Sequence, residues 1–272
     1  MKNHRTHVCR IAAVALAVAG CSETPPAPED AGMNTPDTGV EEPPELGGLV
    51  QIGEVHMNTF DMWMVGAGAG FALPSERTAP TPIATYGFCN VFEQEEPGAG
   101  APVRDGGSIQ VTGGVYDFDL TMASGGYAAS IPRTVDDLFA GGETMHVQAE
   151  GGPDVPAFAL DVVAPAPIDV LSPCLSCGLD VDRALEWSIT WTPGAEGEVH
   201  LELSGGGVAV ACVAPDAAGA LTVPVEALAH LPATANGMLM FKRTGRAQTS
   251  AGDVALVTAE IDSTQCSMGM IR

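Results

Sequence analysis

The sequence predicts an all-β protein whose folded part consists of two β-sandwich domains. Many short segments alternate apolar and polar residues with a period of two, which is typical of half-buried strands. Glycine and proline mark the ends of these segments, and the 272 residues include 33 Gly and 21 Pro. Because no stretch of ten or more residues keeps a convincing helical period, we do not expect a helical core.

In the first half of the chain, alternation predicts strands at residues 49–55, 108–112, 115–120, 145–149 and 157–164. One short helical turn is predicted within 134–139. Three prolines between 165 and 173 indicate a junction. We therefore expect an N-terminal domain over 45–168 and a C-terminal domain over 169–272.

In the second half, strands are predicted at residues 185–191, 197–203, 208–213, 221–223, 238–243 and 253–261. Trp187, Ile189 and Trp191 share one strand face and should point into a core. Short strands at such close spacing suit a β-sandwich. Residues 225–231 form at most two helical turns.

The N-terminus has the features of a signal peptide. Residues 1–10 contain three basic residues and no acid, and residues 11–19 are an uninterrupted apolar run. Such a run spans about 13 Å as a helix, far less than the roughly 30 Å hydrocarbon core, so we expect cleavage. The sequence Val18-Ala19-Gly20-Cys21 resembles the bacterial lipoprotein box. This resemblance implies that residues 1–20 are removed and that Cys21 is lipidated.

Two or three acyl chains on Cys21, at roughly 0.8 kcal/mol per buried CH₂, would give a stable membrane anchor. Ser22 replaces the aspartate that retains many such proteins in the inner membrane, so we expect the outer membrane. Residues 21–44 are rich in proline and acids and contain no aromatic residue. We expect a disordered tether that holds the folded part up to roughly 70 Å from the lipid.

The formal net charge is −23, and the predicted signal peptide removes basic residues but no acids. A chain this acidic repels nucleic acid and anionic headgroups, so no nucleic-acid partner is expected.

Several glycine- and proline-rich segments consist mostly of turn residues, namely Val111–Gly114, Phe139–Thr144, Asp154–Phe158, Trp191–Gly194 and Pro215–Pro232. Together they resemble a family of uncharacterised bacterial lipoproteins with immunoglobulin-like or similar β domains. The resemblance covers most of residues 45–272. It implies an immunoglobulin-like fold and supplies no catalytic motif.

Five cysteines remain after the signal peptide and Cys21, and an exported chain meets an oxidising compartment. We expect one disulfide between Cys174 and Cys177 and another between Cys212 and Cys266, which leaves Cys89 as the odd cysteine. A Cys89–Cys212 bond across the domain boundary is the alternative. The CxxC spacing also fits a redox or zinc half-site, but no βαβ pattern surrounds it.

A histidine and three methionines, His56, Met57, Met62 and Met64, lie close together around Trp63. Thioether ligands beside a histidine suit Cu(I), which makes these four residues a candidate metal site. The alternative is that the methionines pack as core residues.

Other residues offer weaker signals for metal binding. Met268 and Met270 repeat the Met-x-Met spacing near Cys266, while Asp117 with Asp119 and Asp180 with Asp182 are paired carboxylates that can hold calcium. In so acidic a chain, such pairs also arise as solvated faces.

The sequence contains no GxSxG, SxxK or HExxH arrangement. We therefore expect a non-catalytic interaction or structural module of the cell envelope that needs no cofactor. Its partners would be the membrane, through the Cys21 lipid, and an envelope protein or polysaccharide. The alternatives are a lipoprotein that binds a small ligand or a metal, copper or calcium, and, less favoured, a hydrolase without a sequence motif.

Overall fold

The structure is a computed structural model that describes residues 46–76, 80–94, 104–123, 126–132, 135, 137–194 and 197–272. These residues form an all-β architecture, as predicted. The signal peptide, the lipidation site Cys21 and the tether over 21–44 lie outside the described residues. Within the described ranges, no helix is both long and apolar enough to cross a membrane.

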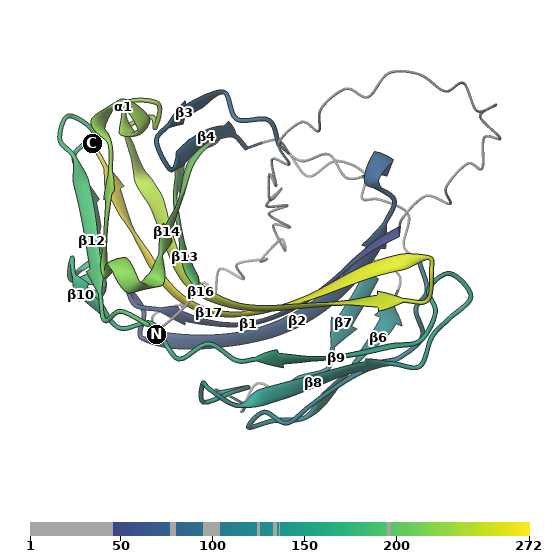
Figure 1. The fold of residues 1–272 in the computed structure, drawn as a ribbon. Helices are drawn as coiled ribbons and strands as arrows, with labels where there is room; N and C mark the ends of the chain where they lie inside the picture. Colours follow the sequence, from purple (N-terminus) through teal and green to yellow (C-terminus); the bar gives the residue numbers. More distant parts are fainter. Residues whose placement is uncertain are drawn as a thin grey trace, which may run out of the picture.

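Four long strands form the centre of the sheet: β1 (Leu46–Met57), β2 (Met62–Ala72), β16 (Thr234–Ala251) and β17 (Ala255–Ile271). β16 and β17 form an antiparallel hairpin, and β1 lies between β17, to which it is parallel, and β2, to which it is antiparallel. The four strands curve together (Figure 1).

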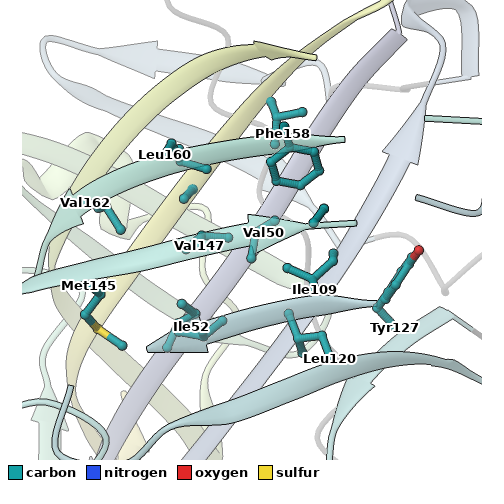
Figure 2. Packing of buried hydrophobic residues seen from close by; sticks show 14 of the residues in the cluster. Val50, Ile52, Ile109, Leu120, Tyr127, Met145, Val147, Phe158, Leu160 and Val162 are labelled. Carbon is teal, nitrogen blue, oxygen red and sulfur yellow. The ribbon is translucent and has the colours of Figure 1, made fainter. Parts of the chain in front are cut away.

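At one end, the sheet continues from β2 through shorter strands in the order β7-β6-β5-β8-β9. Their bounds are Ile109–Thr112 for β5, Phe118–Ala123 for β6, Gly126–Ala129 for β7, Thr144–Ala149 for β8 and Phe158–Val163 for β9. These strands turn beneath the long ones and enclose the first hydrophobic core (Figure 2). Val50 and Ile52 of β1 lie fully buried in this core with Ile109, Leu120 and Met145.

At the other end, β16 is followed by β13 (Glu198–Gly205), β14 (Val208–Pro215), β4 (Cys89–Glu93) and β3 (Ala84–Tyr86). A separate sheet of β10 (Val170–Ser172), β12 (Trp187–Trp191) and β15 (Ala220–Val223) supplies buried residues to the second core. The short strand β11 (Leu179–Val181) pairs with β17 at this end. The other short elements here are the helix α1 (Val225–Leu228) and the 3₁₀ turns Leu175–Cys177 and Asp216–Ala218. A further 3₁₀ turn, Pro74–Glu76, follows β2. Around the four long strands, β6, β7, β8, β9, β10 and β12 lie on the convex side, whereas β3 and β4 lie at the upper end of the curved sheet (Figure 1).

Trp187, Ile189 and Trp191 point into the second core, as their spacing predicted, with exposed fractions of 9%, 0% and 1%. The strands predicted at 238–243 and 253–261 are parts of the much longer β16 and β17. The short helical turn expected within 134–139 is wrong for the described residues 135 and 137–139, which are not helical.

The expected division into consecutive domains at 168/169 does not describe how the strands pair. β1 pairs with β17, and β4 pairs with β14, so strands from both sides of that boundary share one sheet. The physical reason is the length of the β16–β17 hairpin. Eighteen residues of β16 extend about 60 Å at roughly 3.3 Å per residue, enough to contribute to both cores.

The predicted Cys212–Cys266 disulfide is wrong, because Cys212 is bonded to Cys89 with an S–S distance of 2.04 Å. Cys89 and Cys212 lie directly opposite each other on β4 and β14, whereas Cys266 lies on β17, beyond β13 and β16. The expected Cys174–Cys177 disulfide is present. The Cys89–Cys212 bond therefore joins the two halves of the sequence.

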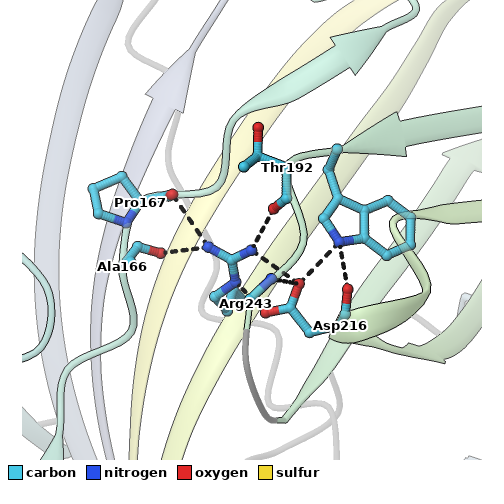
Figure 3. Close-up of polar contacts among 7 residues, drawn as sticks. Ala166, Pro167, Thr192, Asp216 and Arg243 are labelled. Carbon is cyan, nitrogen blue, oxygen red and sulfur yellow. Dashed lines mark hydrogen bonds and ion pairs between the residues drawn. The ribbon is translucent and has the colours of Figure 1, made fainter.

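A buried arginine ties the junction segment to the central sheet (Figure 3). Arg243 of β16 donates hydrogen bonds to the carbonyl oxygens of Ala166, Pro167 and Thr192, at 3.0, 3.2 and 3.0 Å. It also donates to Asp216 Oδ1 at 2.9 Å. The proline-rich segment that was expected to separate two domains is thus held against a strand shared by both cores.

Candidate functional site

The long strands have a second face, opposite the two cores. On β16, Leu239 and Phe241 are fully buried in the second core, while Met238 and Met240 alternate with them. Because successive side chains point to opposite sides of a sheet, the alternating residues form the concave side of the curved sheet in Figure 1. We call this surface the concave face. Its central members are Gln51, Met57, Met62, Met64, His200, Glu202, Met238, Met240, Lys242, Thr244, Arg246, Glu260, Asp262, Thr264, Cys266 and Met268.

One cross-strand row of the concave face is rich in sulfur. Met62 of β2 lies opposite Met57 of β1, Met57 lies beside Cys266 of β17, and Cys266 lies opposite Met240 of β16. The next residue in this row is Glu202 of β13. Segments near residues 60, 240 and 266 are therefore brought together by strand register alone.

A charged cluster lies beside this row and is centred on Asp262. Its Oδ2 accepts hydrogen bonds from Lys242 Nζ at 2.9 Å and from Gln51 Nε2 at 3.2 Å. Its Oδ1 accepts from the Thr244 hydroxyl at 2.6 Å. Asp262 is only 6% exposed, so its carboxylate is fixed by three donors from three different strand positions.

Two more titratable groups of the concave face lie on β13. Burial lowers the pKa of His200, and the nearby Lys242 lowers it further. Burial raises the pKa of Glu202, against the opposing effect of Lys242. Farther along the face, Arg246 pairs with Glu260.

On β2, part of the concave face is formed by glycine residues, which have no side chain. Gly66 and Gly70 are exposed, and a Cβ atom added at either position meets no atom within 4 Å. The opposite positions of β2, Ala67 and Ala69, pack against the first core. Another chain can therefore approach the backbone of β2 closely from the concave side.

The structure separates the four residues of the predicted metal site. His56 lies opposite Trp63, and the two rings stack with centroids 4.5 Å apart. Because Met57 follows His56 directly in β1, the two side chains point to opposite faces of the sheet. Met57, Met62 and Met64 share the concave face, and His56 points to the convex side.

On that side, His56 borders a pocket of about 410 Å³ between the end of β1, the part of β17 around Gln265 and the junction segment. The pocket is lined by His56, Asn58, Ile168, Asp169, Val170, Cys174, Leu175, Ser176 and Gln265. His56 Nδ1 lies 3.3 Å from Gln265 Oε1, and its Nε2 lies 3.3 Å from Asp61 Oδ1. His56 and Cys174, one half of the Cys174–Cys177 disulfide, were both singled out from the sequence, and both line this pocket.

Three of the four paired aspartates have structural partners among the described residues. Asp117 accepts a hydrogen bond from the Gly113 amide at 3.0 Å, and Asp182 accepts one from the Ala184 amide at 3.0 Å. Asp180 forms an exposed ion pair with Arg272. In the described part of the chain, no group of three or more His, Cys, Asp or Glu residues is arranged to hold a metal ion.

Sequence reasoning missed Gln51, Lys242, Thr244 and Asp262 as a cluster. Each is a polar residue that alternates with apolar residues in a strand segment, which is the pattern of an ordinary solvated strand face. Only the register of β1, β16 and β17 brings them together.

Comparison with known proteins adds no relative. The chain matches no family model, no curated protein and no solved structure. The resemblance to lipoproteins with immunoglobulin-like domains stays a prediction from the sequence.

Proposed function

We propose that this chain is a lipid-anchored protein of the outer membrane that acts as a non-catalytic interaction module and binds an envelope protein on its concave face. The anchor at Cys21, the tether over 21–44 and the immunoglobulin-like character of the two cores are parts of this proposal that depend on the sequence. The observation that supports binding is the fixed polar cluster around Asp262.

The arrangement of this cluster favours recognition over chemistry. The Asp262 carboxylate, which is only 6% exposed, accepts hydrogen bonds from Gln51, Lys242 and Thr244. It therefore holds these three partly exposed side chains in place on the concave face. A polar surface that is ordered before binding loses little conformational entropy when a partner arrives.

A protein partner is favoured by the kinds of residue on the concave face. Methionine and arginine are enriched at protein interfaces, and both occur here, at Met240 and Arg246. The chain has a formal net charge of −23, which favours a partner with a basic surface and accelerates their encounter. A polysaccharide partner is the competing outcome of the test below.

The test blocks the concave face at its glycines. Gly66→Tyr and Gly70→Tyr place a large side chain where the structure has open space, and neither glycine has a positive φ. Val163→Tyr is the matched control, because Val163 is 57% exposed on β9. Each full-length chain is first used to capture binding proteins from solubilised envelopes. In a second experiment, each chain is mixed with purified envelope polysaccharide, and co-sedimentation measures its binding to the polysaccharide.

We expect one protein to be captured by the wild type and by the Val163 variant but lost by both glycine variants. If both glycine variants keep the same captured proteins as the wild type, the concave face is not the binding surface. If the wild type and the Val163 variant co-sediment with the polysaccharide and the glycine variants do not, the partner is a glycan and not a protein.

A further inference from the structure

We propose that the concave face binds Cu(I) at two sites, each formed by three methionine thioethers. The first triad consists of Met57, Met62 and Met64 on β1 and β2. The second consists of Met238, Met240 and Met268 on β16 and β17. This inference does not depend on the proposed interaction with an envelope protein.

The two triads have the same geometry. In the first, Met57 lies directly opposite Met62, and Met64 is two residues farther along β2 on the same face. Directly opposite residues have Cβ atoms about 4.5–5.5 Å apart, and diagonal neighbours about 7–8 Å, within reach of long side chains. Methionine has three rotatable bonds beyond its Cα atom, so three sulfur atoms can converge on one ion.

The second triad repeats this arrangement on the other side of Cys266. Met238 lies directly opposite Met268, and Met240 is two residues farther along β16 on the same face. Cys266 lies between the triads, beside Met57 and opposite Met240. The two triads thus present six thioethers on four adjacent strands.

Ordinary core packing does not account for these methionines. Met145, which packs in the first core, has an exposed fraction of 0%, whereas Met62 is 46% exposed. The other five triad members are partly exposed as well. These six of the chain's 11 methionines lie on one face, although they come from three distant segments, and Met270 lies two residues beyond Met268 on the same face of β17.

The donor set indicates the kind of metal. Thioether sulfur is a soft, uncharged ligand that selects Cu(I) over hard cations such as magnesium and calcium. The imidazole of His56 points to the opposite face and is excluded from the first triad. The imidazole of His200, which is on the concave face, lies opposite Lys242 and outside both triads. Each site should therefore contain sulfur ligands without nitrogen.

The test is a titration of the purified full-length chain with Cu(I), in competition with a chromogenic Cu(I) chelator and with ascorbate to keep the copper monovalent. We expect two bound equivalents for the wild type. The triple variant Met57→Leu, Met62→Leu, Met64→Leu should bind one equivalent, and so should the variant with leucine at 238, 240 and 268. The variant with all six substitutions should bind none.

Leucine nearly conserves the volume of methionine, so the fold should persist, and circular dichroism checks this for each variant. Met122→Leu is the matched control, because Met122 is 38% exposed on β6, away from both triads. His56→Ala is the second control, and both should keep two equivalents. X-ray absorption of the copper-loaded wild type should give sulfur neighbours only.

Three results would overturn the proposal. The first is a wild type that binds fewer than two equivalents. The second is a folded triple-leucine variant that still binds two, and the third is an imidazole nitrogen in the copper coordination shell. None of these results bears on the glycine variants that test the protein interaction, so the two proposals fail independently.

Discussion

Arg243 and Asp216 form an ion pair inside the protein, with Arg243 Nε 2.5 Å from Asp216 Oδ2. The two residues lie on β16 and on the 3₁₀ turn after β14, and their side chains are 10% and 1% exposed. Asp216 Oδ1 also accepts hydrogen bonds from Trp191 Nε1 at 2.9 Å and from the Gly194 amide at 3.1 Å. Although burial acts to raise its pKa, these bonds and Arg243 hold the pKa of Asp216 below its ordinary value.

Arg243→Ala should therefore destabilise the protein strongly. It leaves the Asp216 carboxylate buried without its cation and frees three carbonyl oxygens of hydrogen bonds, which should cost about 3–5 kcal/mol. Arg243→Lys keeps the charge but lacks the planar fork, so an intermediate loss is expected. Urea unfolding measures both, and an alanine variant within 1 kcal/mol of the wild type would contradict the role assigned to this pair.

The two disulfides should contribute unequally to stability. Cys89 and Cys212 are 123 residues apart, so in the chain-entropy model their bond stabilises the fold by about 5 kcal/mol. Cys174 and Cys177 are 3 residues apart, and the same relation gives roughly 2 kcal/mol. We expect the Cys89→Ala, Cys212→Ala chain to unfold at a much lower urea concentration than the Cys174→Ala, Cys177→Ala chain. Peptide mapping without reduction should recover Cys89 linked to Cys212. Recovery of a Cys212–Cys266 peptide would contradict the Cys89–Cys212 disulfide.

Glu54 should make stability depend on pH. Its side chain is 2% exposed, and its Oε1 accepts hydrogen bonds from the backbone amides of Leu138 and Phe139. Burial raises the pKa of Glu54 above its ordinary value of 4.5, against the opposing effect of these hydrogen bonds. The folded state therefore binds the proton more tightly than the unfolded state. Stability should fall as the pH rises from about 4.5 through the raised pKa.

Glu54→Gln is the variant that tests this, because its carbonyl oxygen can accept the same two hydrogen bonds without a charge. We expect the glutamine variant to lose this part of the pH dependence and to be at least as stable as the wild type at neutral pH. Glu54→Val removes the acceptor and should cost about 1–3 kcal/mol for each unsatisfied amide. Unfolding curves between pH 4 and 8 provide the measurement, and parallel pH profiles for the wild type and the glutamine variant would refute it.

Cys21→Ala should release the protein from the membrane or leave its precursor uncleaved. Without the thiol, no lipid can be attached, and the hold of the acyl chains is lost. Detergent-phase partitioning of cells that express each chain measures the outcome. Cys266→Ala is the matched cysteine control and should partition like the wild type. An unchanged distribution of the Cys21 variant would mean that the lipoprotein-box resemblance is misleading.

Local pattern was sufficient for part of the fold. Trp187, Ile189 and Trp191 alternate so regularly that their burial followed from the period of a strand. β2 was not predicted as a strand, because its sequence from Met62 to Ala72 contains Gly66, Gly68 and Gly70, and glycine is depleted in strands. That strand forms because its alanines pack on the first core and its backbone pairs with β1, both of which are tertiary effects.

In the candidate site, too, some residue groups were visible in the sequence and others depended on strand pairing. The local group His56, Met57, Met62 and Met64 was visible in the sequence, but the two faces of β1 separate its histidine from its methionines. The second triad and the Asp262 cluster were not visible. Met238 and Met268 are 30 positions apart, and Gln51 and Asp262 are 211 apart. Only pairing across the long strands makes them neighbours.

The sequence by itself determined the all-β class, the burial of the tryptophan strand and the Cys174–Cys177 pairing, because each depends on a period or spacing of a few residues. Tertiary structure alone decided that Cys89 bonds Cys212, that β1 pairs with β17 and that the six methionines share one face. The physical reason is that strand register is a long-range property. It is fixed by which hydrophobic faces are buried together, and a shift of one residue would turn every side chain to the opposite side of the sheet.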